Sequence, residues 1–310
     1  MDFGSINLVV LFASLMVAST PLLLAAVGEL VVERSGVLNL GVEGMMIVGA
    51  VCGFIATVET GSPAIGFVAG AAGATLLALL FAVLTQVFLS NQVATGLGLT
   101  LFGLGVSALM GQSYAQMRTP TSPRWEWFGL NDLPVVGPIL FHQHPVVYLS
   151  LISVIGVWWF LRTTRAGLIL RAVGENHEAA HALGYSVLKT RFAAIAFGGA
   201  CAGLGGAFLS LVIVPQWTDG MTSGRGWIAL AIVVFASWKA GRVLLGAYLF
   251  GGVSVLQLNL QAAGIAIPVE LLSISPYLIT ILVLVVMSSD RNRAALNAPA
   301  SLGRSFHASS

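Results

Sequence analysis

Long apolar stretches alternate with short polar segments along nearly the whole chain, from Ile6 to Met287. A helix that crosses a bilayer needs about 20 mostly apolar residues. The pattern therefore predicts about nine transmembrane helices. They are expected at residues 6–27, 44–58, 63–89, 93–111, 145–161, 192–214, 226–239, 243–260 and 269–287. The second and seventh stretches are short, so each is a candidate for a partial or broken helix.

The composition agrees with this pattern, because 57% of the residues are hydrophobic, 8% are charged and the mean hydropathy is +0.93. Soluble domains carry roughly 25% charged residues, so most of this surface cannot face water. Cys52 and Cys201 both lie in apolar stretches, where they are expected to be small core residues and not a disulfide or metal pair. We expect an all-α, polytopic membrane protein whose 310 residues form one transmembrane domain.

The distribution of Lys and Arg predicts the orientation, because these residues concentrate in cytoplasmic loops. With the loop 162–191 in the cytoplasm, nine crossings place the N-terminus outside, the polar loop 112–144 outside and the tail 288–310 inside. Of the 14 basic residues, three then lie outside: Arg118, Arg124 and Arg225. The cytoplasmic ones are Arg34, Arg162, Arg165, Arg171, Lys189, Arg191, Lys239, Arg242, Arg291, Arg293 and Arg304.

The sequence lacks the residues typical of two ways of driving transport, ATP hydrolysis and ion coupling. Neither lysine, Lys189 or Lys239, follows a glycine, so the chain lacks the phosphate-binding loop of ATPases. Ion-coupled carriers usually bury acids near the bilayer centre. By the expected boundaries every acid lies at or beyond the membrane edge, including Glu29, Glu33 and Glu43 at the inner one. An ion-coupled secondary carrier is therefore the less favoured alternative, although backbone carbonyls also bind sodium.

The stretch His177-Glu178-Ala179-Ala180-His181 matches the H-E-x-x-H pattern of zinc proteases. A catalytic zinc needs a third protein ligand. His142 and His144 fall on the opposite side of the membrane, and His307 lies in the polar tail. A membrane zinc metalloprotease is thus a remote alternative, and no metal site is expected.

The same loop has the local signals of a short helix that begins near His177. Glu175 and Asn176 are suited to cap it, and Gly184 is suited to end it in the left-handed conformation. An amphipathic helix bearing small residues, among them Ala179 and Ala180, would fit a groove on a soluble partner.

Three motifs resemble the permeases of ABC importers that carry branched-chain amino acids, ribose and nucleosides. The first is Arg171–Asn176 with Glu178–Ala180 and Leu183–Val187, which resembles the coupling loop of that superfamily. The second is Glu33–Gly44, between the first two expected helices. The third is Leu296–Ala300 with Leu302 and Gly303, which is similar to the tail of the nucleoside branch.

The resemblance implies a membrane permease subunit, not an enzyme, in a bacterial plasma membrane. It implies two cytoplasmic ATPase subunits, a second identical or homologous permease and an extracytoplasmic solute-binding protein. ATP and Mg²⁺ would bind to the ATPase, with no cofactor in this chain and no nucleic acid as partner. The solute would be a nucleoside or a simple sugar. The coupling residues would be Gly174, Glu175, Asn176, Glu178, Ala179, Ala180 and Gly184.

Polar and aromatic side chains near the ends of the expected helices are candidates for the solute path. Asn and Thr bond to a sugar hydroxyl or a base edge, and Trp at that depth serves as a gate. Each also has a structural explanation, since Thr and Asn bond neighbouring helices and Trp anchors at the membrane interface. The candidates are Asn39, Asn91, Gln92, Thr95, Thr100, Trp217 and Trp227.

Overall fold

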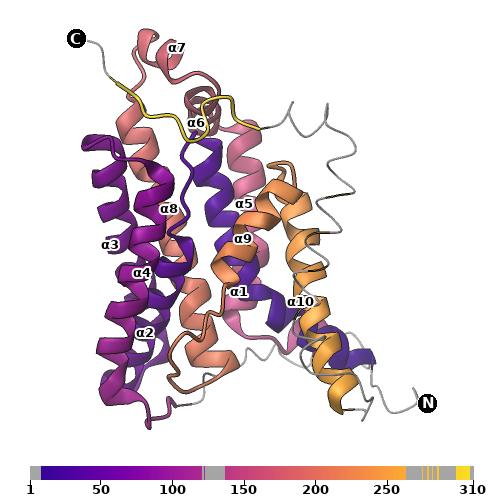
Figure 1. Cartoon of the computed structure of the whole chain (residues 1–310). Helices are drawn as coiled ribbons and strands as arrows, with labels where there is room; N and C mark the ends of the chain where they lie inside the picture. Colours follow the sequence, from indigo (N-terminus) through magenta and orange to yellow (C-terminus); the bar gives the residue numbers. More distant parts are fainter. Residues whose placement is uncertain are drawn as a thin grey trace.

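A computed structural model describes residues 8–120, 122, 137–262 and 298–307, together with the single positions 274, 278, 281 and 285. Within these residues the protein is all-helical, and the only β contact is an isolated antiparallel bridge between Arg118 and Gln216. The helices run roughly side by side and form one bundle (Figure 1).

Seven of the described helices are long and apolar enough to cross a membrane. In a bilayer, backbone groups must be satisfied within the segment, so apolar runs of this length become helices. The seven are α1 (Leu8–Arg34), α2 (Val42–Thr60), α3 (Pro63–Ala82), α4 (Gln92–Gly111), α5 (Pro145–Thr163), α8 (Val187–Phe208) and α10 (Ala240–Ala262). Shorter π-helical or 3₁₀ turns are η2 (Val83–Val87), η3 (Gln112–Tyr114), η5 (Gly137–Phe141) and η6 (Leu209–Ile213).

The expected count of nine spans is not confirmed. The stretch at 226–239 forms α9 (Arg225–Phe235), which has 11 residues and is too short to cross a bilayer by itself. Arg225, expected in an outer loop, is its first residue. The other short stretch, at 44–58, is an unbroken helix of 19 residues. The ninth expected span, 269–287, lies outside the described residues apart from four single positions.

The centre of the bundle is made by α1, α2, α3 and α8, which pack closely against one another. Small residues allow the close approach that helices in lipid rely on. Gly49 of α2 and Gly203 of α8 lie against each other, and a Cβ added to Gly49 would overlap the backbone of Gly203. The cluster of glycines in the expected spans thus serves helix packing at these positions.

The chain between α1 and α2, residues 35–41, is not helical. It descends along the bundle from the C-terminal end of α1 to the start of α2 (Figure 1). Most of its residues are buried, so its backbone groups need partners from other elements. This segment, called the 35–41 segment below, brings the expected helix break at Asn39 inside the protein.

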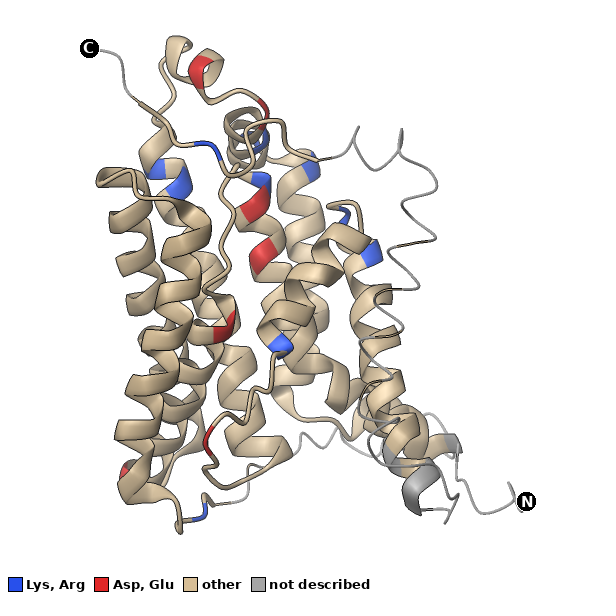
Figure 2. Ribbon diagram, in the orientation of Figure 1, with Lys and Arg blue, Asp and Glu red and all other residues tan. Residues whose placement is uncertain are grey.

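One end of the bundle carries two short helices, α6 (Arg165–Glu175) and α7 (His177–Ala182), together with residues 298–307 (Figure 1). Basic residues gather toward this end (Figure 2). The N-terminal end of α1 lies at the opposite end of the bundle. The part of the expected tail 288–310 that is described is therefore packed on the protein.

Candidate functional site

Helix α7 begins and ends as its sequence predicts. The side chain of Asn176 accepts a hydrogen bond of 2.9 Å from the backbone N–H of Ala179, which caps the helix. Gly184 has a φ of +85° and donates its N–H to the carbonyl of His181, which ends the helix. Glu175 does not cap α7, because it is the last residue of α6.

The two faces of α7 differ sharply. Ala180 is buried against Val173, Val187 and Phe306, so it faces the protein and cannot enter a partner's groove. The expectation for Ala180 is therefore wrong in this respect, because the tail covers it. Glu178 and Ala179 are exposed, as is Leu183 with 76% of its surface accessible. The free face of the helix is formed by these residues and Ala182.

Residues 298–307 cover the inner face of α7. The ring of Phe306 packs edge-on against His177 and His181, with centroid distances of 5.5 and 5.2 Å. Burial lowers the pKa of His177, and the positive charge of Arg191 lowers it further. His177 is thus favoured in its neutral form, which suits an apolar contact with Phe306.

The H-E-x-x-H stretch does lie on a helix, but its two histidines are occupied by packing on Phe306. Among the described residues, no group of three potential ligands is arranged to hold a metal ion. His177 also contacts Nη2 of Arg191 through its Nδ1 at 3.4 Å. A cation beside this imidazole opposes the binding of a metal ion there.

Arg191 is fully buried at the start of α8 and joins four segments. Its guanidinium donates to the carbonyl of Ser35 at 3.3 Å, to Oε1 of Gln86 at 3.1 Å and to the carbonyl of Arg304 at 3.1 Å. The contact with His177 completes the set. A buried cation is tolerated when its donors are satisfied, and here neutral acceptors satisfy them.

Three of the candidate path residues meet at the 35–41 segment. Gln92 accepts from the N–H of Leu38 at 2.8 Å, and Thr100 donates to the carbonyl of Leu40 at 3.1 Å. Asn39 accepts from the N–H of Gly41 at 3.0 Å. These three polar side chains therefore supply the partners that an irregular backbone needs inside a membrane protein.

The first helix was expected to end at residue 27, which is wrong, because α1 continues to Arg34. Glu29 and Glu33 lie within α1, Glu43 lies in the first turn of α2, and all three are buried. Their partners lie in other segments of the chain. Asn39 lies 3.5 Å from Glu29, and the indole N–H of Trp238 donates to Glu33. No described residue donates to Oε1 of Glu29.

Charged side chains of α1 and α2 form hydrogen bonds at both ends of helix α9. At its N-terminal end, Oε1 of Glu43 accepts from Thr222 and from the N–H of Gly224, at 2.6 and 2.8 Å. Just beyond its C-terminal end, Arg34 donates to the carbonyl of Trp238 at 2.9 Å, beside the bond from that indole to Glu33. A half-length helix is thus fixed within the bundle by α1 and α2.

The other candidate path residues lie elsewhere. Asn91 caps α4 by accepting from the N–H of Ala94, and Thr95 bonds to Ser90. Trp217 is buried in a cluster with Phe54 and is a core residue. Trp227 is 46% exposed on α9. These four residues do not meet the group around the 35–41 segment through any described hydrogen bond or ring contact.

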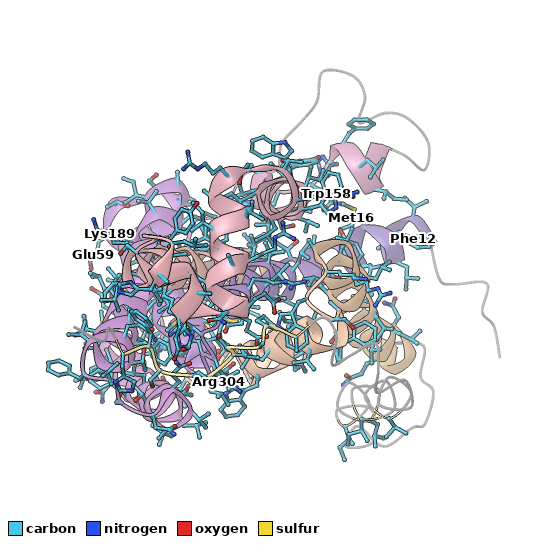
Figure 3. All side chains as sticks on the ribbon, turned by 90° about the horizontal axis from the view of Figure 1, so that it is seen from above. Phe12, Met16, Glu59, Trp158, Lys189 and Arg304 are labelled. Carbon is cyan, nitrogen blue, oxygen red and sulfur yellow. The ribbon has the colours of Figure 1, made fainter. Side chains whose placement is uncertain are left out.

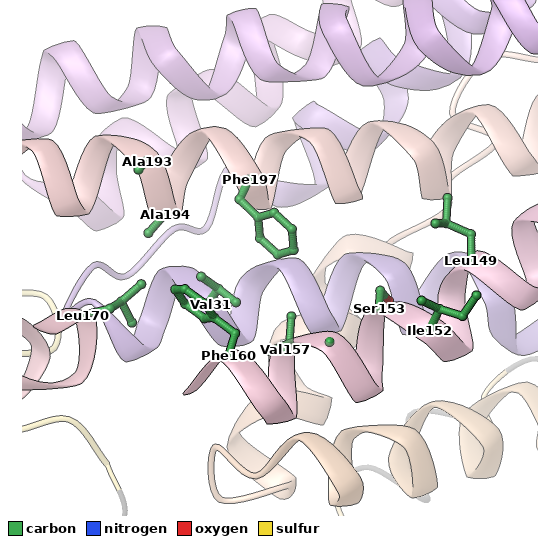
Figure 4. A pocket seen from close by; sticks show the side chains of 11 residues that line it. Val31, Leu149, Ile152, Ser153, Val157, Phe160, Leu170, Ala193, Ala194 and Phe197 are labelled. Atoms are coloured by element: carbon green, nitrogen blue, oxygen red, sulfur yellow. The ribbon is translucent and has the colours of Figure 1, made fainter. Parts of the chain in front are cut away.

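A groove of about 460 Å³ runs between α5 and the helices α1, α6 and α8 (Figure 4). Its described lining is apolar except for Ser153, and includes Val31, Phe160 and Phe197. Such walls offer a polar solute almost no hydrogen bonds. The groove suits hydrocarbon, and the polar residues around the 35–41 segment remain the better candidates for a solute path.

The chain matches, over residues 11–287, the family described as the permease component of branched-chain amino acid transport systems. The chain belongs to this family. It is 42% identical to a putative glucose ABC transporter permease protein of Haloferax volcanii, over 94% of this chain and 95% of that one. It is 32% identical to a guanosine ABC transporter permease protein of Bacillus subtilis, over 92% and 93%. A nucleoside ABC transporter permease protein of Lactococcus lactis is 31% identical, over 90% and 92%. No solved structure matches.

Membership in this family, together with several apolar helices, makes the chain a multi-pass membrane permease subunit. Such a subunit is not itself an enzyme. A permease component of an ABC transport system works with an ATPase and a solute-binding protein.

Proposed function

We propose that residues 1–310 form one permease domain of an ATP-driven importer for a nucleoside or a simple sugar. Two ATPase subunits bind ATP and Mg²⁺ on the cytoplasmic side, and a second permease, identical or homologous, completes the path. The N-terminus is outside and the C-terminus is cytoplasmic. The observation that carries the proposal is the free face of α7, a capped helix beside the basic end of the bundle.

Leu183 is the docking residue in this proposal, flanked by Glu178, Ala179 and Ala182. It lies just beyond the last turn of α7 and is the most exposed large apolar side chain of the protein's described part. An apolar side chain that projects from a helix end toward water is suited to fill a pocket on a soluble partner. Gly174, Glu175, Asn176, Ala180 and Gly184 have a different role here, since they shape α7 and seat it.

The charges around the 35–41 segment favour a neutral solute. Glu43 already occupies the N-terminal end of α9, which would otherwise be suited to bind an anion. Glu29 and Glu33 add two more carboxyl groups, which accept hydrogen bonds from hydroxyl or N–H groups. Nucleosides and sugars carry such donors and no net charge. The names of the related permeases, which refer to glucose, guanosine and nucleosides, agree with this choice.

The test measures uptake of radiolabelled guanosine and glucose by cells that produce the whole transporter. An ATP-driven importer loses uptake when ATP is depleted and keeps it when an uncoupler collapses the proton gradient. Uptake that survives ATP depletion and fails with the uncoupler would contradict the proposal and favour an ion-coupled carrier. Three acids are buried in α1 and α2, so a lack of buried acids can no longer be used as an argument against that carrier.

A further inference from the structure

Residues 298–307 form a strap that connects two distant parts of the chain. The N–H of Ser301 donates to the carbonyl of Gly174 at 2.9 Å, and its hydroxyl donates to the carbonyl of Glu175 at 3.2 Å. Two residues later, the N–H of Gly303 donates to the carbonyl of Gly36 at 3.1 Å. The strap therefore joins the C-terminal end of α6 to the start of the 35–41 segment. Viewed down the bundle, the part that carries Arg304 lies across the helices (Figure 3).

The far end of the strap is seated under α7. Phe306 is only 6% exposed and packs against the rings of His177 and His181. The buried cluster around it also contains Val173 of α6 and Val187 of α8. Removal of this ring would leave a cavity beneath the helix and weaken its packing on the rest of the protein.

Arg191 fixes the same parts from the inside. Its donors reach the carbonyls of Ser35 and Arg304, while its Nη2 meets Nδ1 of His177. One planar group thus holds the 35–41 segment, the strap and α7 at fixed distances. A lysine has one nitrogen and cannot reproduce this pattern of contacts.

Direct backbone contact adds to these bonds. Gly174 of α6 lies against the backbone of Arg34 and Gly36, so closely that an added Cβ would overlap the carbonyl of Arg34. Gly36 has a φ of +86°, which lets the chain turn at this contact. The end of α6 and the start of the 35–41 segment consequently have no room to move independently.

We propose that Arg191 is a positioning residue and that residues 298–307 lock α7 and the 35–41 segment into one rigid unit. A displacement of α7 by the ATPase then moves the 35–41 segment and, through Glu43, the N-terminal end of α9. The solute path opens or closes by this route. The inference rests on the proposed function, because it takes the ATPase to be the source of the displacement.

The test uses the whole transporter in proteoliposomes, with Cys52 and Cys201 replaced. Spin labels are placed at Leu40 in the segment and at Tyr185, which lies outside the free face and donates its N–H to the carbonyl of Ala180 in α7. Distances are measured without nucleotide and after trapping with Mg-ATP and vanadate. In the otherwise unchanged protein the distance between the two labels stays fixed. In three variants it shifts by about 2 Å or more on trapping, as expected when packed elements slide. The variants are Arg191→Lys, Phe306→Ala and a chain that stops after Asn297, while a chain that stops after His307 is the control.

Trapping is expected to proceed in the variants, because the free face of α7 is unchanged, and this separates a role in positioning from a loss of folding. The proposal is overturned if the distance shifts in the unchanged protein, or if it stays fixed in Arg191→Lys and Phe306→Ala. These two point variants decide the matter if the shortened chain does not accumulate. Failure of the proposed function has another signature, since the unchanged permease would then retain no ATPase subunits.

Discussion

The backbone N–H of Gly226 donates a hydrogen bond of 2.6 Å to Oε2 of Glu43, so a side chain of α2 closes the N-terminal end of α9. The other carboxylate oxygen accepts from Thr222 and Gly224. A helix N-terminus carries partial positive charge and unpaired N–H groups, and a carboxylate compensates both. This arrangement explains how an 11-residue helix is held within a membrane bundle.

Replacement of Glu43 by Gln should loosen α9. One carboxylate oxygen becomes an NH₂ group, which cannot accept from the glycine N–H groups and leaves at least one of them unsatisfied. The expected loss of stability is about 1–3 kcal/mol. Thermal unfolding of the purified protein measures the loss, and hydrogen exchange at Gly224 and Gly226 locates it. Glu59→Gln is the control, because Glu59 bonds to the Tyr114 hydroxyl in an exposed position. Equal effects of the two changes would refute the role of Glu43.

Replacement of Leu183 by Arg should weaken the docking of the ATPase without harm to the permease itself. Leu183 is 76% exposed, so its loss removes little packing within the chain, whereas an apolar pocket on the partner would reject a guanidinium. Co-purification of the ATPase is expected to fall about tenfold or more. Leu183→Met keeps the apolar side chain and is expected to behave like the unchanged protein. Normal co-purification of the Arg variant at normal abundance would place the docking surface elsewhere.

The local features of the chain could be predicted from the sequence. Apolar runs indicated the seven long helices, although α1 continues seven residues beyond its expected end at residue 27. Asn176 and Gly184 indicated the two ends of α7. These features depend on hydropathy, capping and backbone conformation over a few neighbouring residues. The non-helical chain around Asn39 was visible in the same way, from polar and glycine residues in sequence.

The polar contacts inside the bundle could not be predicted, because they join segments far apart in the chain. Glu33 was taken for a boundary residue, yet its partner Trp238 comes from the chain between α9 and α10. Arg191 was counted only for topology, although it bonds to Ser35, Gln86 and Arg304. A signal existed for Arg191, namely a cation at the start of an apolar run, but its four partners come from η2, α7, the 35–41 segment and the tail.

Acid should loosen the strap through His177. Burial lowers the pKa of this imidazole in the folded protein, and Arg191 lowers it further, so the released form binds a proton more readily. The stabilisation that the neutral ring gives to the attached strap is therefore complete above the ordinary histidine pKa of about 6.5. This stabilisation is lost as the pH falls below that value. A spin label at Ser305 is expected to become more mobile between pH 7.5 and pH 5.5. His177→Gln should reduce this pH dependence, and His181→Gln controls for the loss of a ring from Phe306. Equal pH dependence in the unchanged protein and the His177 variant would contradict the assignment.

The two ends of the bundle should lie on opposite sides of the membrane, with α7 in the cytoplasm. Basic residues gather toward the end that carries α6 and α7, and each Lys or Arg near the surface favours the cytoplasmic leaflet by about 1 kcal/mol. Gln116 is exposed after α4, near the bridge between Arg118 and Gln216, and Asn176 is exposed between α6 and α7. With Cys52 and Cys201 replaced, a cysteine at Gln116 should react with an impermeant thiol reagent in intact cells. Cysteines at Asn176 and His307 should react only after the membrane is opened. If His307 reacts from outside while Asn176 stays silent, the chain after α8 crosses the membrane in a different number of passes. The short helix α9 would then be a re-entrant element that returns to the side from which it entered.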